Sequence, residues 1–302
     1  MSADAPKKGQ WLSSAVARMD EEPSGRRREW VVNTAPTGRW PALLLDQFWT
    51  HRELIYFFAL RDLKVRYKQA FLGIAWAGIQ PLIGALTFTI LFNRLADVDI
   101  EGHSYFAFAL LGFGVWTYYS TTLQSGTGSL LHNAELLTKV SFPKIVAPTA
   151  AMLPGFIDLS VAMTLATVLA LASGDGFAGV NLLIGLPLGL AMLVLAVGGP
   201  VLFLSASLVK YRDASTLVTF ALQLLLFASP VAYPPEFVPD GWRTVLYLNP
   251  LAGALGLLRA ALVGTDLPNA GHLLLSGVVA IVGFLLGLLH FRRSEREFAD
   301  II

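Results

Sequence analysis

A short basic stretch precedes the first long apolar run of the sequence. Residues 61–69, RDLKVRYKQ, carry four basic side chains, Arg61, Lys64, Arg66 and Lys68, and one acid. A guanidinium binds a phosphate group through two parallel hydrogen bonds, and an ammonium binds it as a point charge. A simpler role is anchoring to anionic lipid, at about 1 kcal/mol per charge. Either role requires a membrane or a phosphorylated ligand beside this segment.

Motifs for other chemistry are absent from the sequence. It contains no G-x-x-x-x-G-K-[ST] phosphate loop, no H-E-x-x-H and no G-x-S-x-G. It has no cysteine, and its five histidines are scattered without ligand spacing. We therefore expect no catalytic residue, no metal site and no nucleotide hydrolysis in this chain, so a partner must supply the energy for any work.

Asp158 is the one acid well inside a predicted apolar span. An ionisable residue at such a position normally faces a partner or water. We expect a structural hydrogen bond to a neighbouring helix, and a place in a pore lining is the alternative. A proton relay is disfavoured, because no second buried acid or histidine continues the path.

The elements that position these residues are predicted to lie mostly in a membrane. The chain is 55% hydrophobic and 14% charged, whereas soluble domains have about 25% charged residues. A span needs roughly 20 apolar residues, and six windows qualify. They are residues 71–92, 105–123, 145–172, 182–209, 217–233 and 273–290. Because isolated strands leave their backbone groups unpaired in lipid, the predicted fold class is an all-α integral membrane protein with six transmembrane helices.

Basic residues orient these spans. With the N-terminus in the cytoplasm, eleven of the basic residues from Arg61 onward fall in inner segments, against three in outer segments. The inner ones are Arg61, Lys64, Arg66, Lys68, Lys139, Lys144, Lys210, Arg212, Arg292, Arg293 and Arg296. The outer ones are Arg94, Arg243 and Arg259. The positive-inside rule therefore predicts that both termini are cytoplasmic.

Four segments follow from this pattern. Residues 1–39 are polar and predicted to be a disordered cytoplasmic tail. Residues 40–69 combine the basic segment with an amphipathic helix, whose apolar face is predicted to lie among lipid headgroups rather than on the protein. Residues 70–291 form the transmembrane domain, and residues 292–302 form a cytoplasmic C-terminal tail. The apolar face of the amphipathic helix consists of Leu44, Phe48, Ile55 and Phe58.

The segment between the fifth and sixth windows is too broken to cross the membrane. Residues 235–263 contain two short apolar pieces separated by Pro239-Asp240-Gly241 and Asn249-Pro250. We expect a pair of re-entrant helices that dips back from the outer face. Such a pair must be buried in protein or lie beside a water-filled cavity.

Several short motifs occur together in a fixed order. They are LGIAWAGIQPL (72–82), LLGFGVWTYY (110–119), HNAELLTKVSFPK (132–144), SPVAY (229–233) and LNPLAGALGLLR (248–259). Together they resemble the permease subunit of ABC-2-type exporters of polysaccharides and polyol phosphates, such as O-antigen, capsule and teichoic acid. The resemblance covers roughly residues 40–292.

The resemblance implies a function and partners. Such a permease is a homodimer in the bacterial inner membrane that pairs with two copies of a separate ATPase, which binds ATP and Mg. It exports a polyprenyl-pyrophosphate-linked glycan, with O-antigen as the favoured cargo, through a channel between its protomers. The basic residues at 61, 64, 66 and 68 would face the cytoplasmic entrance and capture the pyrophosphate. Lipid anchoring and ATPase contact stay as alternatives.

The resemblance also implies roles for three further groups of residues. A short helix in residues 131–144 would transmit ATPase movement, unless it is an ordinary capped loop. Its residues are Asn133 as the cap, Glu135 in the first turn, Lys139, Phe142, Pro143 as the stop, and Lys144. Aromatic residues would stack on sugars in the channel, unless they fill helix interfaces or the headgroup belt. These are Trp116, Tyr118, Tyr119, Phe220, Phe227 and Tyr233.

The third group is in the re-entrant pair. Asn249, Pro250 and Arg259 would belong to a periplasmic gate, with Arg259 paired to a carboxylate or a helix C-terminus. The alternative is a rigid plug whose helices never move.

Other classes fit the sequence less well. A secondary transporter would need several intramembrane ionisable groups and often inverted repeats. A membrane enzyme would need a cluster of His, Asp or Glu at one membrane face. The nearest competitor is an ABC-2 permease for a small lipid or drug.

Overall fold

The computed structural model of the chain describes residues 50–68, 73–95, 100, 102–139, 142–174, 179–211 and 213–295. Within these ranges the backbone forms helices and no β-strand. The predicted C-terminal tail at residues 292–302 begins too early, because the last helix continues to Glu295. The predicted tail at residues 1–39, residues 296–302, and the part of the amphipathic helix that contains Leu44 and Phe48 lie outside the described residues.

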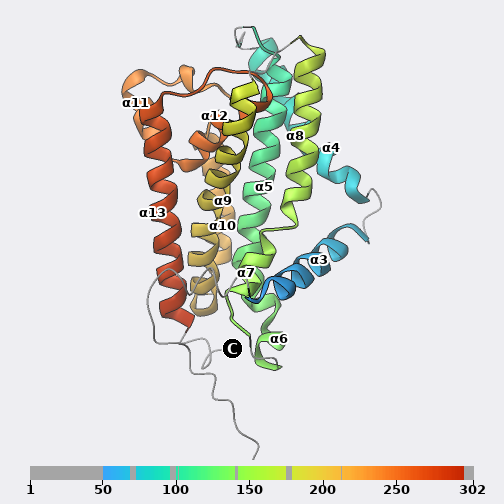
Figure 1. Cartoon of the computed structure of the whole chain (residues 1–302), viewed down its shortest axis with the longest axis vertical. Helices are drawn as coiled ribbons and strands as arrows, with labels where there is room; N and C mark the ends of the chain where they lie inside the picture. The colour runs from blue at the N-terminus through green and yellow to red at the C-terminus, as the bar shows by residue number, and fades with distance from the viewer. Residues whose placement is uncertain are drawn as a thin grey trace, which may run out of the picture. The chain divides into compact units, whose positions relative to one another are not determined.

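The helices follow one another with short connections (Figure 1). The first five are α3 (Arg52–Lys68), α4 (Trp76–Phe88), α5 (Tyr105–His132), α6 (Ala134–Lys139) and α7 (Val146–Ala151). The next six are α8 (Gly155–Ala172), α9 (Gly179–Lys210), α10 (Ala214–Ala228), α11 (Asp240–Leu246), α12 (Pro250–Leu262) and α13 (Ala270–Glu295). A 3₁₀ turn (Gly73–Ala75) precedes α4, and a π-helical segment (Thr89–Leu95) continues it. Helices α3 and α6 lie at one end of the bundle, and α11 lies at the other.

Four helical segments are long and apolar enough to cross a membrane. They are Gly73–Leu95, Val146–Ala172, Asn181–Lys210 and Ala270–Glu295. These confirm the first, third, fourth and sixth predicted windows as apolar helices of spanning length. The α11–α12 pair, bent by 99°, has the composition of a fifth, broken span or of a re-entrant loop. A total of six spans, and the side on which the termini lie, stay predictions.

The second and fifth predicted windows differ from the other four in length and composition. Helix α5 has 28 residues but is more polar than a lipid-facing span, and α10 has only 15 residues. The polarity of α5 follows from its surroundings, because α4, α7, α8, α9 and α10 all pack on it. A helix surrounded by protein can carry Gly, Ser and Thr at its interfaces without exposing them to lipid.

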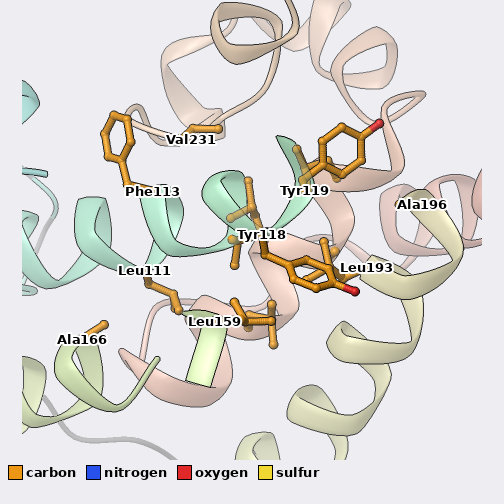
Figure 2. Packing of buried hydrophobic residues seen from close by; sticks show 14 of the residues in the cluster. Leu111, Phe113, Tyr118, Tyr119, Leu159, Ala166, Leu193, Ala196 and Val231 are labelled. Carbon is orange, nitrogen blue, oxygen red and sulfur yellow. The ribbon is translucent and has the colours of Figure 1, made fainter. Parts of the chain in front are cut away.

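The hydrophobic core is built around α5. Figure 2 shows Leu111 and Tyr118 of α5 beside Leu159 of α8 and Leu193 of α9. Each of these four side chains is almost completely buried. The core therefore holds α5, α8 and α9 as one unit, against which the more peripheral α3 and α10 are placed.

Helix α3 packs on protein, which corrects one prediction. Ile55 and Phe58 are buried in a small apolar cluster with Val146 and Ala150 of α7, and the ring of Phe58 lies 5.6 Å from that of Phe142. The prediction that this face enters the headgroup region is therefore wrong for Ile55 and Phe58. Pro154 interrupts the third span and separates the short α7 from α8. Helix α3 packs on the side of α7.

Candidate functional site

The basic segment lies at the C-terminal end of α3, and the helix divides its charges between two faces. Arg61 and Arg66 line a cleft between α3, α5 and the break that separates α7 from α8. Lys64 and Lys68 line a different groove, beside the start of α4 and of α8. Arg66 lies two positions from both lysines, about 200° around the helix, so it faces the other side. Arg61 lies only about 60° from Lys64, but its side chain lines the cleft with Arg66 and not the groove of the lysines. The sequence prediction treated the four charges as one cluster, whereas the structure separates them.

The cleft on the arginine side, which we call the hydroxyl cleft, has a volume of about 290 Å³. Its polar groups are two guanidiniums, one carboxylate, four hydroxyls, an imidazole and an amide. They belong to Arg61, Arg66, Asp62, Thr121, Thr122, Ser125, Ser129, His132 and Asn133. Such a set suits a ligand that combines negative charge with hydroxyl groups.

Asp158 fixes one of the two arginines. Its carboxylate is only 4% exposed and forms an ion pair with Arg66 at 2.7 Å, and it accepts a hydrogen bond from the hydroxyl of Tyr67. Burial, followed by this hydrogen bond, raises the pKa of Tyr67 well above its usual value, so the hydroxyl stays a donor. The expected hydrogen bond between Asp158 and a neighbouring helix is present, and the neighbour is α3.

Arg61 is engaged more weakly. Its guanidinium pairs with the adjacent Asp62 at 2.7 Å, and both side chains reach solvent. Exposed pairs of this kind contribute about 0–1 kcal/mol, so an anionic ligand can compete for Arg61. Arg66 could offer a ligand only the part of its guanidinium that is not already paired with Asp158.

The hydroxyl row on α5 was not singled out from the sequence. Thr121, Ser125 and Ser129 follow one another at intervals of four, which places them on one helical face. That spacing was visible in residues 121–129. What the sequence could not show is that α3 would cover this face with its two arginines.

The predicted coupling helix is present as α6, and its surroundings are partly described. Glu135 is in its first turn and is exposed. Asn133 was expected to cap this helix, but its side-chain amide donates instead to Ser129 O of α5 at 2.7 Å, so it ends α5. The side chain of Lys139 lies outside the described residues.

The end of this loop is tied to the last helix. The backbone N–H of Lys144 donates to the carboxylate of Glu295 at 3.3 Å. Burial lowers the pKa of Lys144, while the charge of Glu295 acts in the opposite direction. With Phe142 packed on Phe58, the loop contacts both α3 and α13, and Pro143 lies between these two contacts. A displacement of α6 would therefore act on two elements of the bundle.

The predicted channel aromatics fall into two groups. Tyr118 is completely buried and Tyr119 nearly so, and the latter stacks on Trp116 with 6.0 Å between ring centroids. In this conformation the two tyrosines fill helix interfaces, the alternative left open by the sequence. Phe220 and Phe227 of α10 are instead exposed, at 59% and 69%.

Helix α10 presents most of its surface outward. Only Ala214, Val218 and Leu222 of it are buried. Beside it lies a second cleft of about 510 Å³, between α5, α9 and α10, with polar groups from Gln124, Thr127, Ser215 and Thr219. The hydroxyl of Tyr233 donates to Phe227 O at 3.1 Å and so holds the chain that leaves α10.

Arg259 of α12 binds that same chain. Its guanidinium donates to Pro230 O at 2.7 Å and to Val231 O at 2.6 Å. It also lies 3.4 Å from the ring centroid of Phe108 and is 2% exposed. Among the described residues no carboxylate forms an ion pair with Arg259, and the bound carbonyls lie just past the C-terminal end of α10.

Close packing at Gly112 permits this arrangement. A Cβ at Gly112 would lie 2.1 Å from Val231 O and 2.6 Å from the guanidinium of Arg259. Only glycine leaves room for the carbonyl against α5. The LLGFGVW motif therefore has a packing role that its sequence alone did not specify.

Asn249 and Pro250 form the corner of the bent pair. The side chain of Asn249 accepts from Leu251 N–H at 3.0 Å, which caps α12, and its amide donates to Ser229 Oγ at 2.7 Å. Pro250 is the first residue of α12, a position where its missing N–H is not needed. The described residues contain no group of three or more His, Asp or Glu that could hold a metal ion.

Comparison with known proteins gives a consistent set of relatives. The family model described as "ABC-2 type transporter" matches residues 53–263. The chain is 28% identical over 267 residues to an "O-antigen export system permease protein RfbA" of Myxococcus xanthus, covering 86% of this chain and 99% of the relative. It is 24% identical over 253 residues to a protein of the same name from Klebsiella pneumoniae, covering 83% and 95%. It is 22% identical over 237 residues to the "Polysialic acid transport protein KpsM" of Escherichia coli, covering 78% and 91%.

Proposed function

The chain belongs to the ABC-2 type transporter family, and we propose that it is the permease subunit of an ABC transporter that exports a lipid-linked polysaccharide, with O-antigen as the cargo. It is a multi-pass protein of the bacterial inner membrane, as its apolar helices and its relatives indicate. The observation that carries the proposal is the match to O-antigen export permeases along nearly their whole length.

The hydroxyl cleft supports an anionic glycan lipid as the substrate. Arg61 is held by a solvent-exposed pair and a cation–π contact 4.8 Å from the Phe58 ring centroid, and Arg66 is placed by Asp158. These cations would bind the pyrophosphate. The hydroxyls of Thr121, Thr122, Ser125 and Ser129 would form hydrogen bonds with the first sugar. At about 290 Å³ the cleft is large enough for such a headgroup but not for a polymer. The glycan chain itself would then pass elsewhere.

Helix α10 and its cleft are the proposed path of the polymer. A 15-residue helix extends about 22 Å, less than the roughly 30 Å of hydrocarbon. Its exposed face, with Leu217, Phe220, Leu224 and Phe227, would meet a second copy of the chain. Phenylalanine rings stack on the apolar faces of sugars without directional bonds that would stop sliding. The channel would thus form between the protomers of a homodimer.

Energy would come from two copies of a separate ATPase, which bind ATP and Mg. The exposed α6 would dock on that subunit, since it projects at the end of the bundle that also carries α3 (Figure 1). Its contacts at Lys144 and Phe142 would pass movement to α13 and α3. Arg259 and the bent pair, at the opposite end, would form the periplasmic gate.

A gene deletion in the source bacterium tests the proposal. We expect its surface glycan to disappear and the lipid-linked glycan to accumulate in the inner membrane. Wild-type chain should restore export, and a variant with Arg61→Gln, in the hydroxyl cleft, should restore it poorly while keeping its topology. Normal surface glycan in the deletion strain would contradict the proposal. Loss of a capsule rather than O-antigen would support capsule polysaccharide as the cargo, the alternative that the similarity to KpsM favours.

A further inference from the structure

The lysine face of α3 forms a groove that the proposed export mechanism does not use. We call it the lysine groove, and its volume is about 490 Å³. Its lining comes from the end of α3, the 3₁₀ turn before α4, and the first turn of α8. The lining residues are Leu63, Lys64, Tyr67, Lys68, Ile74 and Ile157, none of which lines the hydroxyl cleft.

Two ammonium groups give the groove its charge. Lys64 and Lys68 are four residues apart, so they lie one above the other on the same face of α3. Both are exposed, and neither forms an ion pair or a hydrogen bond with any side chain in the described part of the chain. The neighbouring Tyr67 uses its hydroxyl on Asp158. The charge of the groove is therefore uncompensated.

The rest of the groove is apolar and continues into the membrane. Ile74 is 58% exposed and begins the spanning segment Gly73–Leu95. Ile157 contributes from α8. Trp76 follows Ile74 on the surface and is 48% exposed, as expected for an aromatic residue at the headgroup level. The lining of the groove thus changes from cationic to apolar.

We propose that the lysine groove binds one anionic phospholipid from the leaflet at this end of the bundle. Lys64 and Lys68 hold its phosphate, and Ile74 and Ile157 contact the upper part of its acyl chains. Two positive charges beside an apolar wall complement a lipid that carries a net negative charge, such as phosphatidylglycerol, better than a zwitterionic one. The site shares no lining residue with the hydroxyl cleft, so lipid and substrate occupy different grooves along α3.

The test measures phosphatidylglycerol binding to the purified permease in nanodiscs of zwitterionic lipid, by native mass spectrometry. At about 1 kcal/mol per charge near a membrane surface, Lys64→Gln should weaken binding about fivefold. The double variant with Lys68→Gln should weaken it about 30-fold. Arg61→Gln is the matched control, because it removes one charge from the preceding turn whose side chain lines the hydroxyl cleft and not the lysine groove, and it should leave binding unchanged.

Two further variants separate a built site from general attraction. Replacing both lysines by arginine keeps the charge and should retain binding. Ile157→Trp fills the groove without changing the charge and should weaken binding. If Arg61→Gln weakens binding as much as Lys64→Gln, the attraction is unspecific and the proposal fails.

Two further outcomes would overturn the proposal of a lipid site. Unchanged binding in the double lysine variant would show that the groove holds no lipid. Displacement of phosphatidylglycerol by an equimolar amount of polyprenyl pyrophosphate would show that the groove belongs to the substrate, and the proposal would be overturned. The measurement uses neither ATPase nor glycan, so its failure leaves the export proposal standing.

Discussion

The ion pair between Arg66 and Asp158 allows a prediction about stability that depends on the burial of its two partners. Asp158 is 4% exposed, whereas the side chain of Arg66 is 36% exposed. Arg66→Gln leaves a buried carboxylate with the Tyr67 hydroxyl as its remaining partner. Breaking a buried pair in this way costs about 3–5 kcal/mol. Asp158→Asn leaves the guanidinium of Arg66, which reaches water. The amide oxygen of the new asparagine can still accept the hydrogen bond from Tyr67. We expect this change to cost about 1 kcal/mol.

The double variant provides the decisive comparison. With both charges removed, no buried carboxylate is left unpaired, so Arg66→Gln with Asp158→Asn should cost about 2 kcal/mol, less than Arg66→Gln alone. The resulting coupling energy of about 2–4 kcal/mol is well above the error expected for independent sites. Tyr67→Phe should cost about 1.5–3 kcal/mol, because it removes a hydrogen bond to a charged group.

Unfolding of the purified chain in detergent micelles with increasing sodium dodecyl sulfate measures these effects, and its seven tryptophans report the transition by fluorescence. If the double variant costs as much as the sum of the two single variants, Arg66 and Asp158 are not coupled and the prediction is refuted. An Arg66→Gln variant that is no less stable than Asp158→Asn would also refute it, because Arg66→Gln leaves the buried carboxylate unpaired whereas Asp158→Asn leaves a guanidinium that reaches water.

Four further predictions concern the energy source, the coupling loop, the gate and the core. The chain purified without partners should not hydrolyse ATP, and turnover above a buffer control would contradict this. Glu135→Arg or Lys139→Glu in α6 should reduce recovery of the ATPase in a pull-down without preventing membrane insertion, and unchanged recovery in both would remove α6 as the docking element. Single cysteines along residues 246–258, in a chain with none of its own, should react faster with a membrane-impermeant thiol reagent when the complex is trapped with ATP and substrate; equal labelling would rule out the gate. Gly112→Ala should destabilise the chain by about 1–3 kcal/mol, because its Cβ would lie 2.1 Å from Val231 O, whereas Gly241→Ala, with nothing within 4 Å, should be neutral.

The lipid-facing helices were predictable because a membrane imposes a length and an apolar composition on each crossing. The windows at 71–92, 145–172, 182–209 and 273–290 all became helices of spanning length. The window at 217–233 was drawn too long, because the helix ends at Ala228 and residues 229–233 are not helical. Pro230 indicated this end, since the residue before a proline is disfavoured in a helix.

Contacts between distant segments could not be predicted from the pattern. Asp158 and its partners on α3 are more than 90 residues apart, and periodicity within one helix does not specify which other helix it meets. The same limit explains the error on α3, whose Ile55 and Phe58 were assigned to lipid. Its actual neighbour, α7, exists only because Pro154 breaks the third span. The Pro-Gly pair at 154–155 was visible, but which element would use the break was not.

The link between α10 and the bent pair constrains how a gate at this end can move. Helix α12 is almost wholly buried, whereas Trp242 of α11 is exposed. Arg259 and Asn249 tie α12 to residues 229–231, directly after α10. Helix α10 contacts only α5 and α9 closely, so it is the less restrained side of this link. A rearrangement of α10 against a second protomer would therefore be transmitted through the two carbonyls on Arg259 to the buried helix. In the proposed gate, α12 would open only together with residues 229–231, and the exposed α11 would follow.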